Sequence, residues 1–233
     1  MDRRCVEVLI EAGSDLDVPL NLAAYFNRVE LVKLLLSAGA APESTPIWGV
    51  TPLETALYHG ATQAADVLAA VKVVPVALWT AAGSGRLDLV ATFFDERRRL
   101  RAEAGAHRPN PADVGGPVRV PPTDDPDEIL GEALIYAGLN DRADVVRDLL
   151  ERGVDANSRP LWNATGLHFA VGIASLRIVE HLVAHGADPM IRDELHAVTP
   201  LELAERNAAR DPGSENAIKI RQLLAPAAGA PNI

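Results

Sequence analysis

The side chains best suited to acid–base chemistry in this sequence are Glu54, His59 and His168. Glu54 and His59 lie in the stretch ETALYH, and His168 lies in the phrase TGLHFA. A carboxylate and an imidazole within hydrogen-bond reach of a substrate can act as general acid and base. The sequence contains no nucleophile elbow, no cysteine-based motif and no cluster of carboxylates on one segment. If the chain is an enzyme, these three residues are its candidate catalytic groups, but no spacing requires catalysis.

Two further histidines, His181 and His185, have a spacing that suits a metal ion. Side chains at positions i and i+4 lie on one face of a helix, where both imidazoles can bind the same ion. The sequence supplies no third ligand nearby, so we expect no metal site. The segment GSGRLD at Gly83 follows no predicted strand, which argues against a phosphate-binding loop. We therefore expect no cofactor.

Aromatic residues are scarce, at 4% of the chain, so their positions are informative. Two tryptophans occupy the same place in two related stretches, PIWGVTPLETALYHG from Pro46 and PLWNATGLHFAVGIA from Pro160. Tryptophan and tyrosine supply much of the binding energy at protein interfaces. The candidate binding residues are the aromatic side chains of these stretches and of their relatives elsewhere in the chain: Tyr25, Trp48, Tyr58, Trp79, Tyr136, Trp162 and Phe169.

The two related stretches belong to an internal repeat. Further copies of the same phrase begin at Val18 and Thr199, and weaker versions begin at Val76 and Glu132. Each copy is followed by a segment with apolar residues at positions i, i+3, i+4 and i+7, the pattern of an amphipathic helix. In the regular part of the chain, the alanines that close the phrase recur at almost equal intervals, at Ala137, Ala170 and Ala204.

This phrase and its period resemble the ankyrin repeat, a unit of about 33 residues with two antiparallel helices and a projecting β-turn finger. Thr51-Pro52 and Thr199-Pro200 match the start of its Thr-Pro-Leu-His-x-Ala phrase, where the hydroxyl caps a helix and proline fits the first turn. The resemblance implies an all-α solenoid of about six helix-turn-helix repeats with short fingers. It also implies that partners bind a concave surface formed by the fingers and the first helices.

The resemblance also assigns roles to individual side chains. His168 matches the family's histidine, whose usual role is to tie adjacent repeats together. Tyr136 and Phe169 follow that position and are expected to point into the groove, whereas Trp79 occupies the position itself and is expected to pack between repeats. For Trp48 and Trp162, on two fingers, contact with a partner and packing on a neighbouring finger both stay open.

The repeat spacing is irregular in three places. The interval from Ala56 to Ala81 and the interval from Gly13 to Gly39 are both shorter than one repeat, so we predict two shortened fingers. By contrast, Ala81 and Ala137 are much more than one repeat apart, because an extra segment starts at the basic run RRRLR, which we expect to extend the preceding helix. We predict N-terminal repeats over 1–96, an insert over 97–129 that is either a linker or a lid, C-terminal repeats over 130–225 and a tail over 226–233.

The formal net charge is −10 and the isoelectric point is about 5.0. A nucleic-acid backbone or an anionic membrane would be repelled, so we expect neither as a partner. No apolar run approaches the length of a membrane span, and the single cysteine, Cys5, fits a reducing compartment. We expect a cytoplasmic protein, and the frequent Ala, Arg, Gly and Pro suit a bacterial source.

The sequence favours a non-catalytic binding module that recognises a protein partner through the concave face of the array. As an alternative, the 97–129 insert closes the aromatic groove over a small apolar molecule. The chain would then be a small-molecule binding protein or an atypical enzyme of the cyclase or isomerase kind. A third hypothesis is self-association through the helix that starts at Cys5, which has no first helix before it and offers the apolar residues Val6, Leu9 and Ile10.

Overall fold

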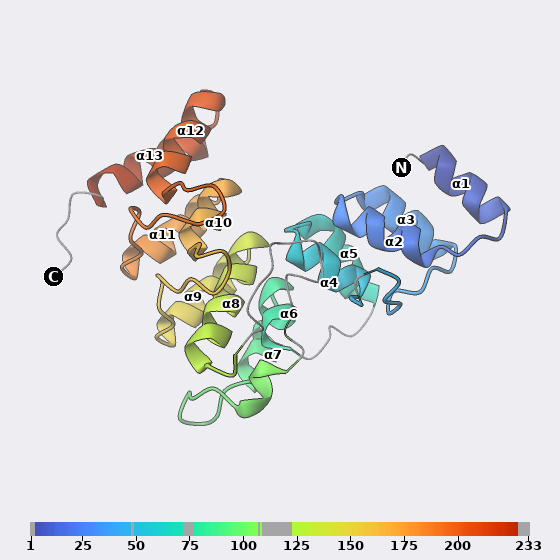
Figure 1. The fold of residues 1–233 in the computed structure, drawn as a ribbon, viewed down its shortest axis with the longest axis horizontal. Helices are drawn as coiled ribbons and strands as arrows, with labels where there is room; N and C mark the ends of the chain where they lie inside the picture. The colour runs from blue at the N-terminus through green and yellow to red at the C-terminus, as the bar shows by residue number, and fades with distance from the viewer. Residues whose placement is uncertain (1–2, 48, 72–76, 107, 109–122, 228–233) are drawn as a thin grey trace. The chain divides into compact units, whose positions relative to one another are not determined.

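The computed structural model of the chain describes residues 3–47, 49–71, 77–106, 108 and 123–227 (Figure 1). The described residues form two compact units. The N-terminal unit contains 3–47 and 49–71, and the C-terminal unit contains 77–106 and 123–227. The division falls within the predicted N-terminal segment 1–96, so the segmentation drawn from the repeat pattern stays a prediction.

The N-terminal unit is built from helices packed in pairs. They are α1 (Arg3–Glu11), α2 (Asp17–Tyr25), α3 (Val29–Ser37), α4 (Pro52–Tyr58) and α5 (Thr62–Val71). Helices α2 and α4 pack side by side, as do α3 and α5, and α1 lies against α3. Asn21 joins the two repeats, because its amide donates to the Val50 carbonyl and accepts from the Thr55 hydroxyl. Helix α1 was predicted to be the second helix of a pair whose first helix is absent, and its contact with α3, the second helix of the following pair, agrees with that prediction.

The C-terminal unit continues the same arrangement. It contains α6 (Leu78–Gly83), α7 (Leu87–Thr92), the 3₁₀-helix η1 (Ala102–Gly105), α8 (Pro126–Leu139), α9 (Ala143–Glu151), α10 (Gly166–Gly172), α11 (Leu176–Ala184), α12 (Pro200–Arg210) and α13 (Glu215–Ala227). The first helices α6, α8, α10 and α12 pack in series, and the second helices α9, α11 and α13 form another series. Leu149, Leu167 and Ile178 are fully buried between these helices. The predicted all-α architecture of stacked helix pairs is confirmed, and the described residues contain six such pairs and no strand.

Two helix starts show the predicted capping chemistry. The hydroxyls of Thr51 and Thr199 accept hydrogen bonds from the amides of Glu54 and Glu202, at 3.2 and 3.1 Å. In return each glutamate carboxylate accepts from the threonine amide, at 2.8 and 3.0 Å. These reciprocal bonds satisfy amides that the first helical turn leaves without partners.

The predicted helical extension into the basic run is wrong. Helix α7 ends at Thr92, and the chain reverses at Arg98, whose φ is 62°. The carboxylate of Asp95 accepts hydrogen bonds from the amides of Arg97 and Arg99, at 2.8 and 2.9 Å. This carboxylate replaces helical carbonyls as the acceptor, so the backbone turns instead of continuing the helix.

Both described ends of the predicted insert lie on the C-terminal unit. In η1, Ala104 is buried, and the next residue, Gly105, lies so close to the start of α8 that a Cβ there would be 3.0 Å from Ile129 Cδ1. The insert therefore begins and ends at neighbouring points of one unit. Whether the insert is a linker or a lid depends on residues 109–122, which lie outside the described residues.

Close packing of α8 against the following finger predicts a difference between two glycines of one helix. A Cβ on Gly131 would lie 2.7 Å from Ser158 Cβ and 3.2 Å from Pro160 Cδ, whereas a Cβ on Gly138 would meet only the Gly166 carbonyl oxygen, at 3.8 Å. We expect Gly131→Ala to lower the free energy of unfolding by about 1–2 kcal/mol. Gly138→Ala should leave it unchanged or raise it by up to about 1 kcal/mol. Equal urea midpoints for the two variants would contradict this packing.

Candidate functional site

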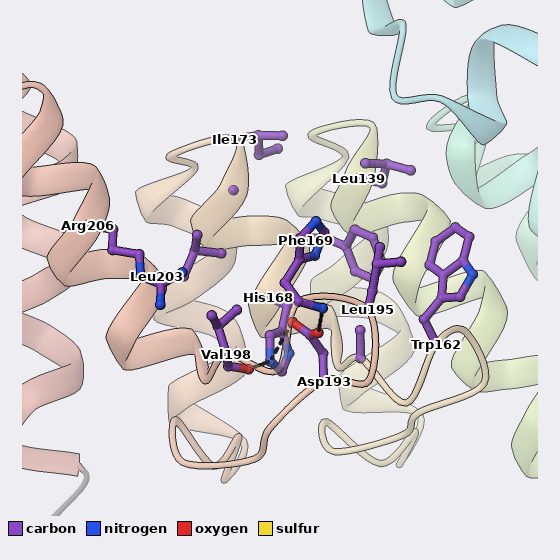
Figure 2. Close-up of a pocket in the computed structure, with 13 residues that line it drawn as sticks. Leu139, Trp162, His168, Phe169, Ile173, Asp193, Leu195, Val198, Leu203 and Arg206 are labelled. Atoms are coloured by element: carbon purple, nitrogen blue, oxygen red, sulfur yellow. Dashed lines mark hydrogen bonds and ion pairs between the residues drawn. The ribbon is translucent and has the colours of Figure 1, made fainter. Parts of the chain in front are cut away.

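The C-terminal unit contains a mostly apolar cavity of about 400 Å³ where α8, α10 and α12 meet the finger that precedes α12 (Figure 2). We call this cavity the groove pocket and that finger, residues 188–198, the α12 finger. The residues that line the groove pocket are Leu139, Trp162, Ala164, His168, Phe169, Gly172, Ile173, Asp193, Leu195, His196, Val198, Leu203 and Arg206. Trp162 and Leu195 lie at one end, and Leu203 and Arg206 lie at the other (Figure 2).

Trp162 enters the groove pocket from a tight turn with an unusual backbone. Trp162 and Asn163 have φ values of 50° and 53°, and the turn joins Leu161 to Ala164 through an isolated antiparallel bridge. Two successive left-handed residues favour Asn and Gly, and any bulky residue there costs about 1–2 kcal/mol. The Trp162 carbonyl accepts a hydrogen bond from the Glu194 amide at 3.0 Å, which ties this turn to the α12 finger.

His168 fixes the α12 finger against α10. Its Nε2 lies 3.1 Å from the Val198 carbonyl oxygen, and its Nδ1 lies 3.1 Å from the Thr165 amide nitrogen and 2.9 Å from Thr165 Oγ1. Because a carbonyl only accepts, Nε2 carries the proton and Nδ1 accepts from Thr165. Burial lowers the pKa of His168 and so favours this neutral form, against the smaller opposing effects of the Val198 carbonyl and Asp193.

Asp193 places a carboxylate in the wall of the groove pocket. The residue is only 7% exposed. Its Oδ1 accepts a hydrogen bond from the His196 amide at 2.6 Å, and its Oδ2 lies 3.9 Å from His168 Nε2, beyond hydrogen-bond distance. Figure 2 shows the carboxylate directed toward His168 below Phe169.

Several apolar side chains of the groove pocket remain open to solvent. Leu195 is 51% exposed and Ile173 is 40% exposed. The rings of Trp162 and Phe169, both half-buried, stand 6.5 Å apart between centroids and 42° from parallel. Covering these apolar and aromatic side chains with another apolar group would be more favourable than leaving them in contact with water.

Of the predicted binding residues, the structure brings only Trp162 and Phe169 into the groove pocket, together with His168. Tyr136 is 1% exposed and packs on Trp79, which is 2% exposed, with ring centroids 4.9 Å apart. Tyr136 therefore lies in the core of the unit and not in an open groove, and Trp79 packs between repeats as its position suggested. Trp48 lies outside the described residues.

The remaining predicted residues belong to the N-terminal unit. The ring of His59 lies 4.1 Å from Tyr25 and 4.9 Å from Tyr58 between centroids, so these three side chains form one cluster. Glu54 accepts from the Thr51 amide and hydroxyl, both at 2.8 Å, and serves as a helix cap. Neither hydrogen-bonding nitrogen of His168 is left over for proton transfer. Glu54 and His168 therefore have structural hydrogen-bond partners, and the ring of His59 packs in the aromatic cluster.

Several residues of the groove pocket were missed from the sequence. The signal that could have found those on the α12 finger is the interval from Ala170 to Ala204, which is longer than the interval from Ala137 to Ala170 and so lengthens this finger. Leu139 and Ile173 gave no signal, because Leu139 ends a first helix and Ile173 follows one, and both turns look ordinary in sequence. The missed residues are Leu139, Ala164, Gly172, Ile173, Asp193, Leu195, His196, Val198, Leu203 and Arg206.

Among the described residues, no group of three or more His, Cys, Asp or Glu side chains is arranged to hold a metal ion. The predicted pair His181 and His185 is linked instead by a contact of 2.8 Å between His185 Nδ1 and the His181 carbonyl oxygen. None of the helices in the described part of the chain has the length and apolarity needed to cross a membrane.

The cluster around His59 predicts a pH-dependent stability of the N-terminal unit. His59 Nε2 is buried without a hydrogen-bond partner among the described residues, and burial lowers the pKa of His59 from 6.5 to about 4. As the pH falls, His59 is therefore protonated in the unfolded chain before it is protonated in the folded chain. The free energy of unfolding should decrease as the pH drops from about 6.5 toward 4.

We expect His59→Phe, which keeps an aromatic ring against Tyr25, to lose less stability than the unaltered chain between pH 7 and pH 4.5. Amide hydrogen exchange within residues 20–69 measures this difference in the N-terminal unit itself. Parallel loss of protection in both proteins would contradict a buried, neutral His59.

Models of ankyrin repeats in many copies match residues 20–69 and 149–204 of this chain. The chain is 28% identical over 208 residues to the B-cell lymphoma 3 protein homolog of Mus musculus, and the matched region covers 83% of this chain and 41% of that protein. It is 41% identical over 71 residues to palmitoyltransferase AKR1 of Lachancea kluyveri, where the matched region covers 30% of this chain and 9% of that protein. It is 46% identical over 70 residues to palmitoyltransferase Hip14 of Drosophila melanogaster, where the matched region covers 29% of this chain and 11% of that protein.

The chain thus spans less than half the length of each of these relatives. What it shares with them is the repeat region, which agrees with the stacked helix pairs, the threonine caps and the histidine that joins α10 to the next finger. The chain belongs to the ankyrin-repeat family, and its repeats indicate a protein-interaction module.

Proposed function

We propose that this module recognises its protein partner through the groove pocket of the C-terminal unit. The observation that carries the proposal is Trp162, a half-buried tryptophan held in a left-handed turn at the mouth of an apolar cavity. Residues in strained backbone conformations cluster at functional sites, because a position whose only role is to form a turn can hold a residue type that adopts the conformation without strain. Asn or Gly would fit this turn without the strain, so the tryptophan is better explained by contact with a partner.

The chemistry of the groove pocket supports binding by side-chain insertion. Phe169, Leu195 and Ile173 offer apolar area next to the Trp162 ring, and interface energy concentrates in such aromatic-rich pockets. The cavity of about 400 Å³ lies within the range of pockets that enclose small ligands or individual side chains.

The small-molecule or enzyme alternative lacks support in the described residues. His168 is engaged at both ring nitrogens, and Glu54 is engaged in a helix cap. The segment that would have to close the groove lies largely outside the described residues. No observation therefore favours a closed pocket in which one of the predicted acid–base residues reaches a substrate.

Two secondary proposals rest on the sequence. Self-association through α1 is supported by Val8, which is 59% exposed on a helix whose Val6 is buried. A cytoplasmic location is supported by the lone exposed Cys5.

The test uses Trp162→Asn, which suits the left-handed turn and removes the ring. Peptides selected from a random displayed library on the unaltered chain should bind this variant at least about tenfold more weakly, as expected for loss of an interface anchor. Its free energy of unfolding should change by no more than about 1 kcal/mol, because relief of the turn offsets lost packing. Titration calorimetry and urea unfolding measure the two quantities.

Met190→Ala is the matched control. Met190 is 50% exposed on the same α12 finger but does not line the groove pocket. Its removal should change peptide affinity by less than about twofold, as expected away from an interface anchor. Equal affinities of all three proteins for the selected peptides would overturn the proposal.

A further inference from the structure

The groove pocket contains one polar group that its apolar walls do not explain. Asp193 is only 7% exposed, yet only its Oδ1 receives a hydrogen bond, from the His196 amide. The nearest donor to Oδ2 is His168 Nε2 at 3.9 Å, and that nitrogen donates to the Val198 carbonyl. Within the described part of the chain, one oxygen of a buried carboxylate is thus open toward the cavity.

Among the described residues no lysine or arginine comes within ion-pair distance of this carboxylate, and its attraction for the neighbouring Arg192 is the weakest of the influences that raise the pKa of that guanidinium. Arg192, the residue before it, is bound to Glu202 at 2.9 and 2.7 Å. Arg206 lines the groove pocket but lies at the end away from Trp162 (Figure 2). Burying a carboxylate without a paired cation is costly, so a bound cation would recover free energy at this position.

The net charge of the chain around the groove pocket also favours a positively charged partner. Residues 123–227 contain 10 Lys and Arg against 18 Asp and Glu, a net charge of −8. An approaching basic segment is therefore attracted before it makes contact.

We propose that the groove pocket takes a lysine or arginine side chain of the partner, an inference that rests on the proposed function. The aliphatic stem of such a side chain packs on Trp162, Phe169 and Leu195, and its charged end donates to Asp193 Oδ2. Lysine and arginine combine an apolar stem with a terminal cation, which matches apolar walls with one carboxylate. The aromatic rings add attraction to the cation.

The test uses pools of random heptapeptides with a fixed central residue, probed with the full chain. The central residue is lysine, arginine, norleucine or glutamate, and norleucine has an unbranched alkyl side chain like the lysine stem without the ammonium group. We expect the lysine and arginine pools to bind about tenfold more tightly than the norleucine pool and the glutamate pool to bind least.

Asp193→Asn should reduce the lysine-to-norleucine ratio to about one, since the asparagine side chain keeps an acceptor for the His196 amide but loses the charge. Asp188→Asn is the matched control. Asp188 lies on the same α12 finger and accepts from the Met190 amide at 2.8 Å, but it does not line the groove pocket. This variant should keep the full ratio.

Three results would overturn the inference, and they separate it from the proposed function. If norleucine binds the unaltered chain as well as lysine does, and Trp162→Asn abolishes both, the groove pocket is an apolar partner site and only the cation is wrong. A lysine preference that survives in a folded Asp193→Asn variant would assign it to general surface charge. If no pool distinguishes the unaltered chain from Trp162→Asn, the proposed function fails as well. The lysine and norleucine comparison on the unaltered chain decides the question even if Asp193→Asn does not fold.

Discussion

The hydrogen bonds of the neutral His168 imidazole are the interactions on which the C-terminal unit depends most. The imidazole accepts at Nδ1 from Thr165, which starts α10, and donates at Nε2 to Val198, which ends the α12 finger. A buried donor or acceptor left without a partner costs about 1–3 kcal/mol, so both contacts resist displacement. Through them the position of the α12 finger is set by α10, and the walls of the groove pocket follow from that position.

The same helical position serves two purposes in different repeats. In α4 and α12 it holds Glu54 and Glu202, whose carboxylates bond to the threonine cap. An imidazole has a second nitrogen on the far side of the ring, so His168 bonds to the cap and to the next finger together. Glu202 contacts the α12 finger instead by accepting a hydrogen bond from Arg192. The α12 finger is thus held from α10 and from α12, which leaves Asp193 and Leu195 fixed between them.

The repeat pattern predicted the helix pairs and the threonine caps, and the resemblance to the ankyrin repeat implied the role of His168, because these depend on contacts within one repeat or between neighbours of constant spacing. The sequence was not sufficient to predict which aromatic rings are accessible. Tyr136 and Phe169 occupy the same repeat position, yet Tyr136 is buried on Trp79 and Phe169 lines a cavity. The difference arises from side chains in adjacent repeats, and no pattern within a repeat encodes it.

Charged residues gave the least reliable predictions. The basic run at Arg97 has good helix formers, but a hydrogen-bonding carboxylate at Asp95 reverses the chain there. Asp193 was missed from the sequence, and its proposed role rests on its burial and on a carboxylate oxygen without a hydrogen-bond donor. Such properties emerge only when fingers and helices are placed in three dimensions.

The most direct measurement of the central claim is a solution NMR structure of the full chain bound to its tightest lysine-centred peptide. We predict intermolecular nuclear Overhauser effects from the lysine methylene protons to the rings of Trp162 and Phe169, with the ammonium within hydrogen-bond distance of Asp193 Oδ2. Intermolecular effects confined to the Tyr25 and His59 cluster, or to the exposed side of α11, would contradict it.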